Sequence, residues 1–70
     1  MEATQALETQ MILMLADENH LIRAEAARAL SGCDSARSRD ALRQALLDRS
    51  VVVQKSAEQS LHLLDRREWP

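Results

Sequence analysis

Three side chains of this 70-residue sequence could bind a metal ion or act as a nucleophile: His20, His62 and Cys33. A catalytic metal site needs at least three ligands that converge on the ion at about 2 Å. The two histidines are expected on different helices, and the sequence offers no obvious third ligand. Cys33 has no His or Lys near it in sequence to lower the pKa of its thiol. We therefore expect surface histidines, an unreactive cysteine, no metal and no cofactor.

The serines lack the sequence setting of a catalytic nucleophile. None lies in a Gly-flanked turn of the kind that exposes a nucleophilic serine, and a single Gly cannot form a Gly-rich phosphate-binding loop. No pair of carboxylates lies in an apolar stretch, where general acid and base catalysis would need it. We therefore expect a non-enzymatic protein.

The composition predicts a small all-α protein. The chain has one Trp, one Gly, one Pro and neither Tyr nor Phe, and the residues that dominate it are good helix formers. Nine basic and 11 acidic residues alternate along the chain to give a net charge of −2, which favours neither nucleic acid nor anionic lipid. The single cysteine cannot form an internal disulfide, and the apolar run 11–16 is too short to span a bilayer. We expect a cytoplasmic protein with one domain, residues 1–70.

Apolar residues at helical spacing predict four helices, over residues 4–16, 20–31, 36–47 and 51–65. Asn19 and Ser50 are expected to cap the second and fourth helices, and either Ser35 or Ser38 the third. Gly32 follows the second helix, where a left-handed C-cap favours glycine. Short interruptions between the helices predict two antiparallel helical hairpins.

Each predicted helix has one apolar stripe that is expected to face the core. In chain order the stripes are Leu7, Met11, Met14, Leu15; Ile22, Ala26, Ala29, Leu30; Leu42, Ala45, Leu46; and Val53, Ala57, Ser60, Leu61, Leu64. Ile12 and Leu13 point away from the first stripe, so this helix is apolar almost all round, and such a helix is normally covered on both sides. Small proteins also expose single apolar residues. We favour self-association through Ile12 and Leu13, or their burial against a further repeat, because a core this small is marginal.

The chain repeats itself with a period of 31 residues. The identical residues of the two copies are Leu15/Leu46, Asp17/Asp48, Ala26/Ala57 and Leu30/Leu61. They fall at the end of one helix, at the turn, where two helices approach closely, and at the end of the next helix. A period of this length is typical of a solenoid, in which each unit buries its apolar face against a neighbour. Repeat one covers about 4–33 and repeat two about 34–65, with a tail at 66–70.

The pattern Leu-x-Asp, a cap, an aliphatic-Arg pair, Ala and a closing Leu resembles the HEAT repeat, in particular the short phycobilisome-lyase-type HEAT-like repeat. The resemblance covers about residues 11–64. It implies hairpins stacked into a right-handed solenoid whose second helices line a concave face for a partner protein, or in some members a nucleic acid. It also implies that Arg23 pairs with Asp17 or Asp48. Gln54, at the matching position of the second repeat, cannot continue a charged ladder.

These features predict a protein–protein interaction module, either the C-terminal part of a longer solenoid or a small self-associating protein. The candidate contact residues lie on the second and fourth helices, facing away from the core: Arg28, Ser31, Lys55, Gln59 and His62. Trp69 in the tail is expected to cover the last hairpin, to lie in solvent or to anchor a partner.

Two other functions remain open. The first is a nucleic-acid-binding module, in which Arg23, Arg28 and Lys55 would meet phosphates, although Glu25 and Glu58 offset their charge. The second is a regulatory partner of a pigment or cofactor enzyme, which the resemblance alone suggests.

Overall fold

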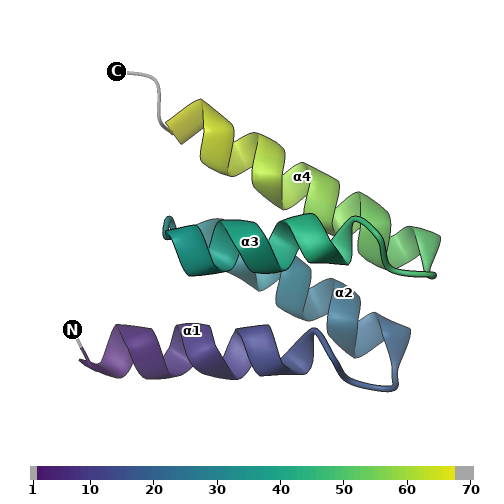
Figure 1. Ribbon diagram of the computed structural model, residues 1–70, viewed down its shortest axis with the longest axis horizontal. Helices are drawn as coiled ribbons and strands as arrows, with labels where there is room; N and C mark the ends of the chain where they lie inside the picture. Colours follow the sequence, from purple (N-terminus) through teal and green to yellow (C-terminus); the bar gives the residue numbers. More distant parts are fainter. Residues whose placement is uncertain (1, 68–70) are drawn as a thin grey trace.

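The computed structural model describes the backbone of residues 2–67 and the side chains of residues 5–66. It contains four helices, α1 (Glu2–Met14), α2 (His20–Ala29), α3 (Ala36–Ala45) and α4 (Val51–Arg67), and a 3₁₀ turn, η1 (Leu30–Gly32), that continues α2 (Figure 1). The all-α prediction is confirmed, and no strand occurs within the described residues. Trp69 lies outside them. None of the described helices is both long and apolar enough to cross a bilayer.

The helices form two antiparallel hairpins that lie side by side (Figure 1). α1 and α3 run in the same direction in one layer, and α2 and α4 form the layer behind them. α4 packs on both α2 and α3, and α2 also packs on α1. The Cα atoms span only 15 Å along the shortest axis, as expected for two layers of helices in contact.

Side-chain oxygens at the starts of α2 and α3 accept hydrogen bonds from backbone amides in the first turn of each helix. The side-chain oxygen of Asn19 accepts a hydrogen bond from the Leu21 amide at 2.9 Å. The hydroxyl of Ser35 accepts one from the Ser38 amide at 3.1 Å. The predicted cap at Asn19 is therefore confirmed, and Ser35 rather than Ser38 caps the third helix.

Two other predicted helix ends differ from the structure. The Ser50 hydroxyl lies 2.9 Å from Nδ1 of His20, so it contacts a side chain of the other hairpin instead of an amide of α4. The left-handed cap predicted at Gly32 is wrong, because no described residue has a positive φ. The chain leaves α2 through the tighter η1 turn, in which the Cys33 amide donates to the Leu30 carbonyl at 3.0 Å.

The core lies between the two layers and is built from aliphatic side chains. Its largest fully buried members come from α2, η1, α3 and α4: Leu30, Leu42, Val53 and Leu64, with Ala27 and Ala57 between them. Apart from Ala27, these positions belong to the predicted stripes of the second, third and fourth helices. Two members of those stripes, Ala29 and Leu46, are exposed instead. Ala26 and Ala57, which are equivalent in the two hairpins, are small and buried, so they leave room for α2 and α4 to pack closely.

The inner face of α1 differs from the predicted stripe. Leu7 is 61% exposed, whereas Met11, Ile12 and Leu15 pack against the core. Glu8 lies on this inner face and is buried. α1 is rotated in this way because Glu8 has hydrogen-bonding partners in the second hairpin, which a local apolar pattern does not reveal.

The same rotation separates the two residues expected to mediate self-association. Ile12 is half-buried against the core, so the prediction that it points outward is wrong. Leu13, its neighbour, is 64% exposed. Only Leu13 of this pair is therefore placed to meet another molecule.

Candidate interaction surfaces

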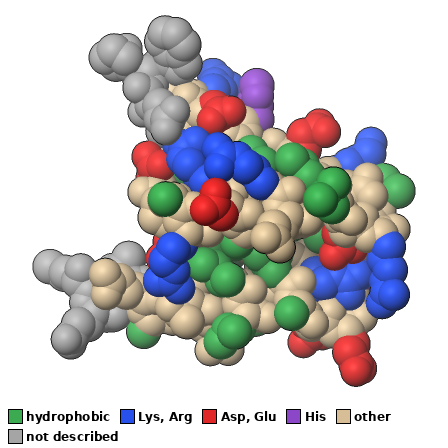
Figure 2. Space-filling view, viewed as in Figure 1, with side chains coloured by type: hydrophobic (Ala, Val, Ile, Leu, Met, Phe, Trp, Pro, Cys, Tyr) green, Lys and Arg blue, Asp and Glu red, His purple; other side chains and the backbone are tan. Residues whose placement is uncertain are grey.

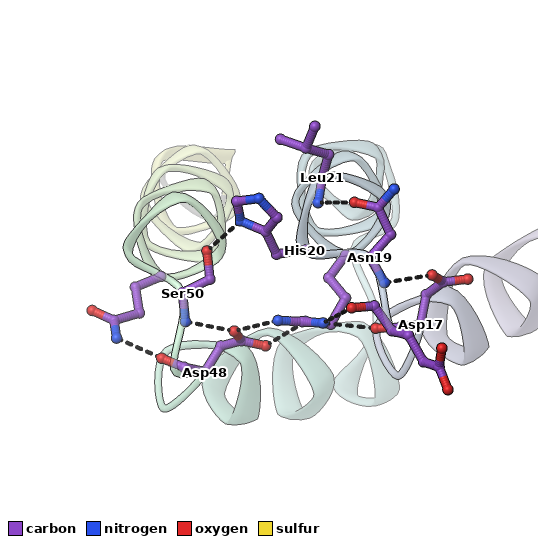
Figure 3. A network of polar contacts seen from close by, with 9 residues as sticks. Asp17, Asn19, His20, Leu21, Asp48 and Ser50 are labelled. Carbon is purple, nitrogen blue, oxygen red and sulfur yellow. Dashed lines mark hydrogen bonds and ion pairs between the residues drawn. The ribbon is translucent and has the colours of Figure 1, made fainter.

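Arg23 joins the two hairpins at their turns. Its Nε and Nη2 atoms lie 2.9 and 3.1 Å from the two carboxylate oxygens of Asp48. Its Nη1 atom donates to the backbone carbonyls of Asp17 and Glu18 at 2.7 and 3.1 Å, and Asp17 and Asp48 lie on either side of this network (Figure 3). The side chains of Arg23 and Asp48 are only 8% and 14% exposed. This paired, shielded geometry is that of a strong ion pair, and it confirms Asp48 rather than the Asp17 carboxylate as the partner.

Gln54 makes half of the same arrangement in the second hairpin. Its Nε2 atom donates to the Asp48 carbonyl, as Arg23 does to the Asp17 carbonyl. The carboxylates of Asp17 and Asp48 make the same local contact. Each accepts a hydrogen bond, at 2.8 Å, from the backbone amide two residues further along the chain. The two turns are therefore built to the same plan, and they differ in whether an arginine reaches the carboxylate.

Glu8 joins α1 to the start of α3. It accepts hydrogen bonds from the hydroxyls of Ser35 and, at 2.6 Å, of Ser38, and Arg37 lies 3.4 Å from its other oxygen. The two hydroxyl hydrogen bonds hold the pKa of Glu8 below its usual value, although burial acts in the opposite direction. The burial of Glu8 was not predicted from the sequence. The available signal was its spacing, since it lies on the same helix face as Met11.

The free energy of unfolding is expected to fall in acid because of Glu8 and Asp48. The hydrogen bond from Arg23 is the main reason that the pKa of Asp48 is also lowered. Both pKa values therefore lie below those of the unfolded chain, about 4.3 for Glu and 3.9 for Asp. The native state binds these protons less readily, so the stabilisation is complete above about pH 5 and is lost as the pH falls through the native pKa values. Urea unfolding followed by circular dichroism from about pH 8 to pH 3 measures this loss.

Two variants identify the source of the pH dependence. Glu8→Gln removes one of the two carboxyl groups whose pKa is lowered in the native state. The unfolding midpoint of this variant should therefore depend less on pH below about pH 5. Glu25→Gln removes an exposed carboxylate and should retain the wild-type dependence. A wild-type midpoint that does not change on acidification would contradict the prediction.

Most of the predicted contact residues line two adjoining hollows on the exposed side of α2 and α4. The first is a shallow groove of about 380 Å³, lined by Glu25, Arg28, Ala29, Ser31, Gln59, Ser60 and Leu63. The second, of about 340 Å³, is lined by Glu58, Gln59 and His62. Lys55 is exposed but lines neither hollow. The structure thus groups Arg28, Ser31, Gln59 and His62.

A third hollow lies between α1 and α3. It has a volume of about 410 Å³ and is lined by Ile12, Leu15, Ala16, Asp40, Ala41, Gln44, Ala45 and Asp48. Hydrophobic side chains gather between α1 and α3 on this face (Figure 2). The hollow depends on how far apart two helices from different hairpins lie, so no local sequence signal reveals it.

The residues first considered for chemistry do not converge. His20 and His62 are both exposed, and within residues 5–66 no three His, Cys, Asp or Glu side chains form a metal site. Cys33 is half-buried against the core. Burial, and secondly the charge of Glu8, raise the pKa of its thiol, which lowers the thiolate fraction on which cysteine reactivity depends.

The fold and these surfaces define a small all-α protein in which two hairpins are joined by buried polar contacts. No protein-family model matches the chain, and neither a curated protein nor a solved structure matches it.

Proposed function

We propose that this protein is a non-enzymatic protein–protein interaction module, in which two HEAT-like hairpins present the exposed side of α2 and α4 to a partner protein. The observation that carries the proposal is the groove lined by Arg28, Ser31 and Gln59. Its floor is fixed, because the buried hydroxyl of Ser60, which lines the groove, donates to the Ala27 carbonyl of the facing helix at 2.6 Å.

Three observations support treating the hairpins as HEAT-like. The two turns are built to one plan 31 residues apart, and Arg23 of the first hairpin pairs with Asp48 of the second. The first helix of each hairpin lies in one layer and the second helix in the other (Figure 1). A position within a longer solenoid and a cytoplasmic location are parts of the same proposal.

The character of the groove favours a protein over a nucleic acid as the partner. Arg28 is paired with Glu25 at 3.1 Å, and Leu63, which is 42% exposed, adds an apolar surface. A mixture of paired charges, amides and an exposed apolar side chain is typical of protein interfaces. Arg23 is occupied by Asp48, so this surface retains little positive charge for phosphates.

Site-specific crosslinking in cells that express the protein tests the proposal. A photoreactive amino acid at Gln59, in the groove, is expected to capture a defined protein. The control carries the same photoreactive amino acid in place of Arg49, which is exposed in the turn before α4. This control should not capture the protein. Equal capture at both positions, or none at Gln59, would count against the groove.

The captured protein is then titrated against purified variants. The double variant Arg28→Ala/Gln59→Ala should bind about tenfold more weakly, because side chains at the centre of an interface carry most of its energy. Arg49→Ala should bind as the wild type does. Retention of DNA or RNA in a mobility-shift assay at low salt, lost in Arg28→Ala/Lys55→Ala, would instead favour the nucleic-acid alternative.

A further inference from the structure

The contact between the two hairpins provides a template for a second contact. The hollow between α1 and α3 separates residues of the two hairpins. On the side of the first hairpin they are Ile12, Leu15 and Ala16, and on the side of the second they are Ala41, Gln44, Ala45 and Asp48. Positions 31 apart occupy equivalent places in the two hairpins, since α1 ends at Met14 and α3 at Ala45. Both halves of this contact therefore recur on the outer sides of the molecule.

The two outer sides can be defined by these equivalences. The α1 edge, on the side of the first hairpin turned away from α3, consists of Gln10, Leu13, Met14 and Asp17. The α3 edge, on the side of the second hairpin turned away from α1, consists of Arg43, Leu46, Leu47 and Gln54. Leu13 is 64% exposed on one edge, and Leu47 is 86% exposed on the other. Their counterparts at the internal contact, Gln44 and Ala16, are exposed beside the hollow, so the two edges carry more apolar surface than the internal contact does.

We infer that the protein associates head to tail with a second copy of itself, the α3 edge of one copy packing on the α1 edge of the next. In this arrangement Leu46 and Leu47 of one copy correspond to Leu15 and Ala16 of the internal contact. They pack on Leu13 and Met14 of the next copy. The inference goes beyond the proposed function, because it uses neither Arg28 nor Gln59 and reaches the groove only at Glu25 on its rim.

Charges in the second layer are compatible with this contact. Lys55 is equivalent to the buried Ala24, and Glu25 is equivalent to the buried Ser56. The head-to-tail arrangement would bring Lys55 of one copy and Glu25 of the next into the same interface, and opposite charges at the rim of an interface favour encounter and register. At the turn, Gln54 faces Asp17 where Arg23 faces Asp48 inside the molecule. Because Gln54 supplies no charge, we expect a weak association that grows with protein concentration.

A contact between two different surfaces builds chains or rings, whereas a contact between identical surfaces stops at a dimer, and this difference gives a decisive test. By sedimentation equilibrium, the apparent mass of the wild type should rise with concentration. Leu13→Glu and Leu47→Glu each block one edge at an exposed position, so each variant alone should be a folded monomer, with folding checked by circular dichroism. An equimolar mixture of the two should form heterodimers and nothing larger, because one intact edge of each variant is left to pair.

A second variant tests the register of the contact. Gln54→Arg should strengthen self-association about tenfold, because the arginine can reach Asp17 of the next copy in the way that Arg23 reaches Asp48. The double variant Gln54→Arg/Asp17→Asn should return to the wild-type level.

Three results would overturn the inference. The first is a wild type that stays monomeric up to about 1 mM, a concentration at which an association free energy of only about −4 kcal/mol would already be visible. The second is self-association of the Leu13→Glu variant or the Leu47→Glu variant on its own, which would indicate a symmetric dimer. The third is a mixture that forms no heterodimer. Because none of these variants touches Arg28 or Gln59, such a result would leave the proposed binding of another protein intact.

Discussion

Arg23→Met should lower the free energy of unfolding by about 3–5 kcal/mol, the usual cost of removing one partner from a buried ion pair. The substitution leaves the Asp48 carboxylate, only 14% exposed, without its charged partner. It also removes the donor to the carbonyls of Asp17 and Glu18, and unmet polar groups of this kind add to the loss. Urea unfolding followed by circular dichroism at neutral pH measures the change.

The matched control is Arg28→Met, which makes the same chemical change at a pair whose Arg28 side chain is 66% exposed. Its effect should lie within about 0.5 kcal/mol, because exposed ion pairs contribute little. A second variant, Arg23→Met/Asp48→Leu, removes both charges and should recover part of the loss. Similar losses for Arg23→Met and Arg28→Met would show that the contact between the turns contributes no more than a surface pair.

Leu30→Ala should lower the free energy of unfolding by about 3–4 kcal/mol, within the range for a leucine removed from a packed core. Leu30 is fully buried, whereas Leu61, at the equivalent position of the second hairpin, is half-buried. Leu61→Ala deletes the same atoms from a site that retains access to water, so we expect a loss of about 1–2 kcal/mol. Urea midpoints of the two variants, measured side by side, give the difference.

The comparison isolates the contribution of the neighbouring hairpin. The two leucines share residue type and place in the repeat, and they differ in how far the surrounding structure covers them. Equal losses would mean that stacking of the second hairpin does not account for the burial of Leu30. A larger loss for Leu61→Ala would contradict the burial that the structure assigns to both residues.

The sequence was sufficient to predict features that depend on neighbours in the chain. The four helices, the cap at Asn19 and the core positions of α4 follow from apolar spacing and from a polar side chain before a helix. The pairing of Arg23 with one of two aspartates followed from the resemblance, because the repeat places both carboxylates in turns. The choice between Asp17 and Asp48 required the distance between two hairpins, which spacing along the chain does not contain.

Most of the errors have one physical origin, a contact between the two hairpins. Leu7 was expected inside and Ile12 outside because the apolar pattern of α1 is almost continuous, so the pattern alone does not fix the rotation of the helix. The hydroxyls of Ser35 and Ser38 fix it by binding Glu8, and they lie in the other hairpin. The hollow between α1 and α3 was not predicted for the same reason, since its walls come from helices of different hairpins. The error at Gly32 was local, because a 3₁₀ turn ended the helix as well as a left-handed residue would.

The contacts made by Glu8 and Arg23 have a joint consequence for the entropy of binding. Glu8 binds the start of α3, and Arg23 binds the turn at its far end. Two attachments at opposite ends of α3 prevent one hairpin from pivoting or sliding on the other, which a single attachment would allow. If the protein binds a partner as we propose, the relative orientation of α2 and α4 is set before the partner binds, so little conformational freedom is lost on association.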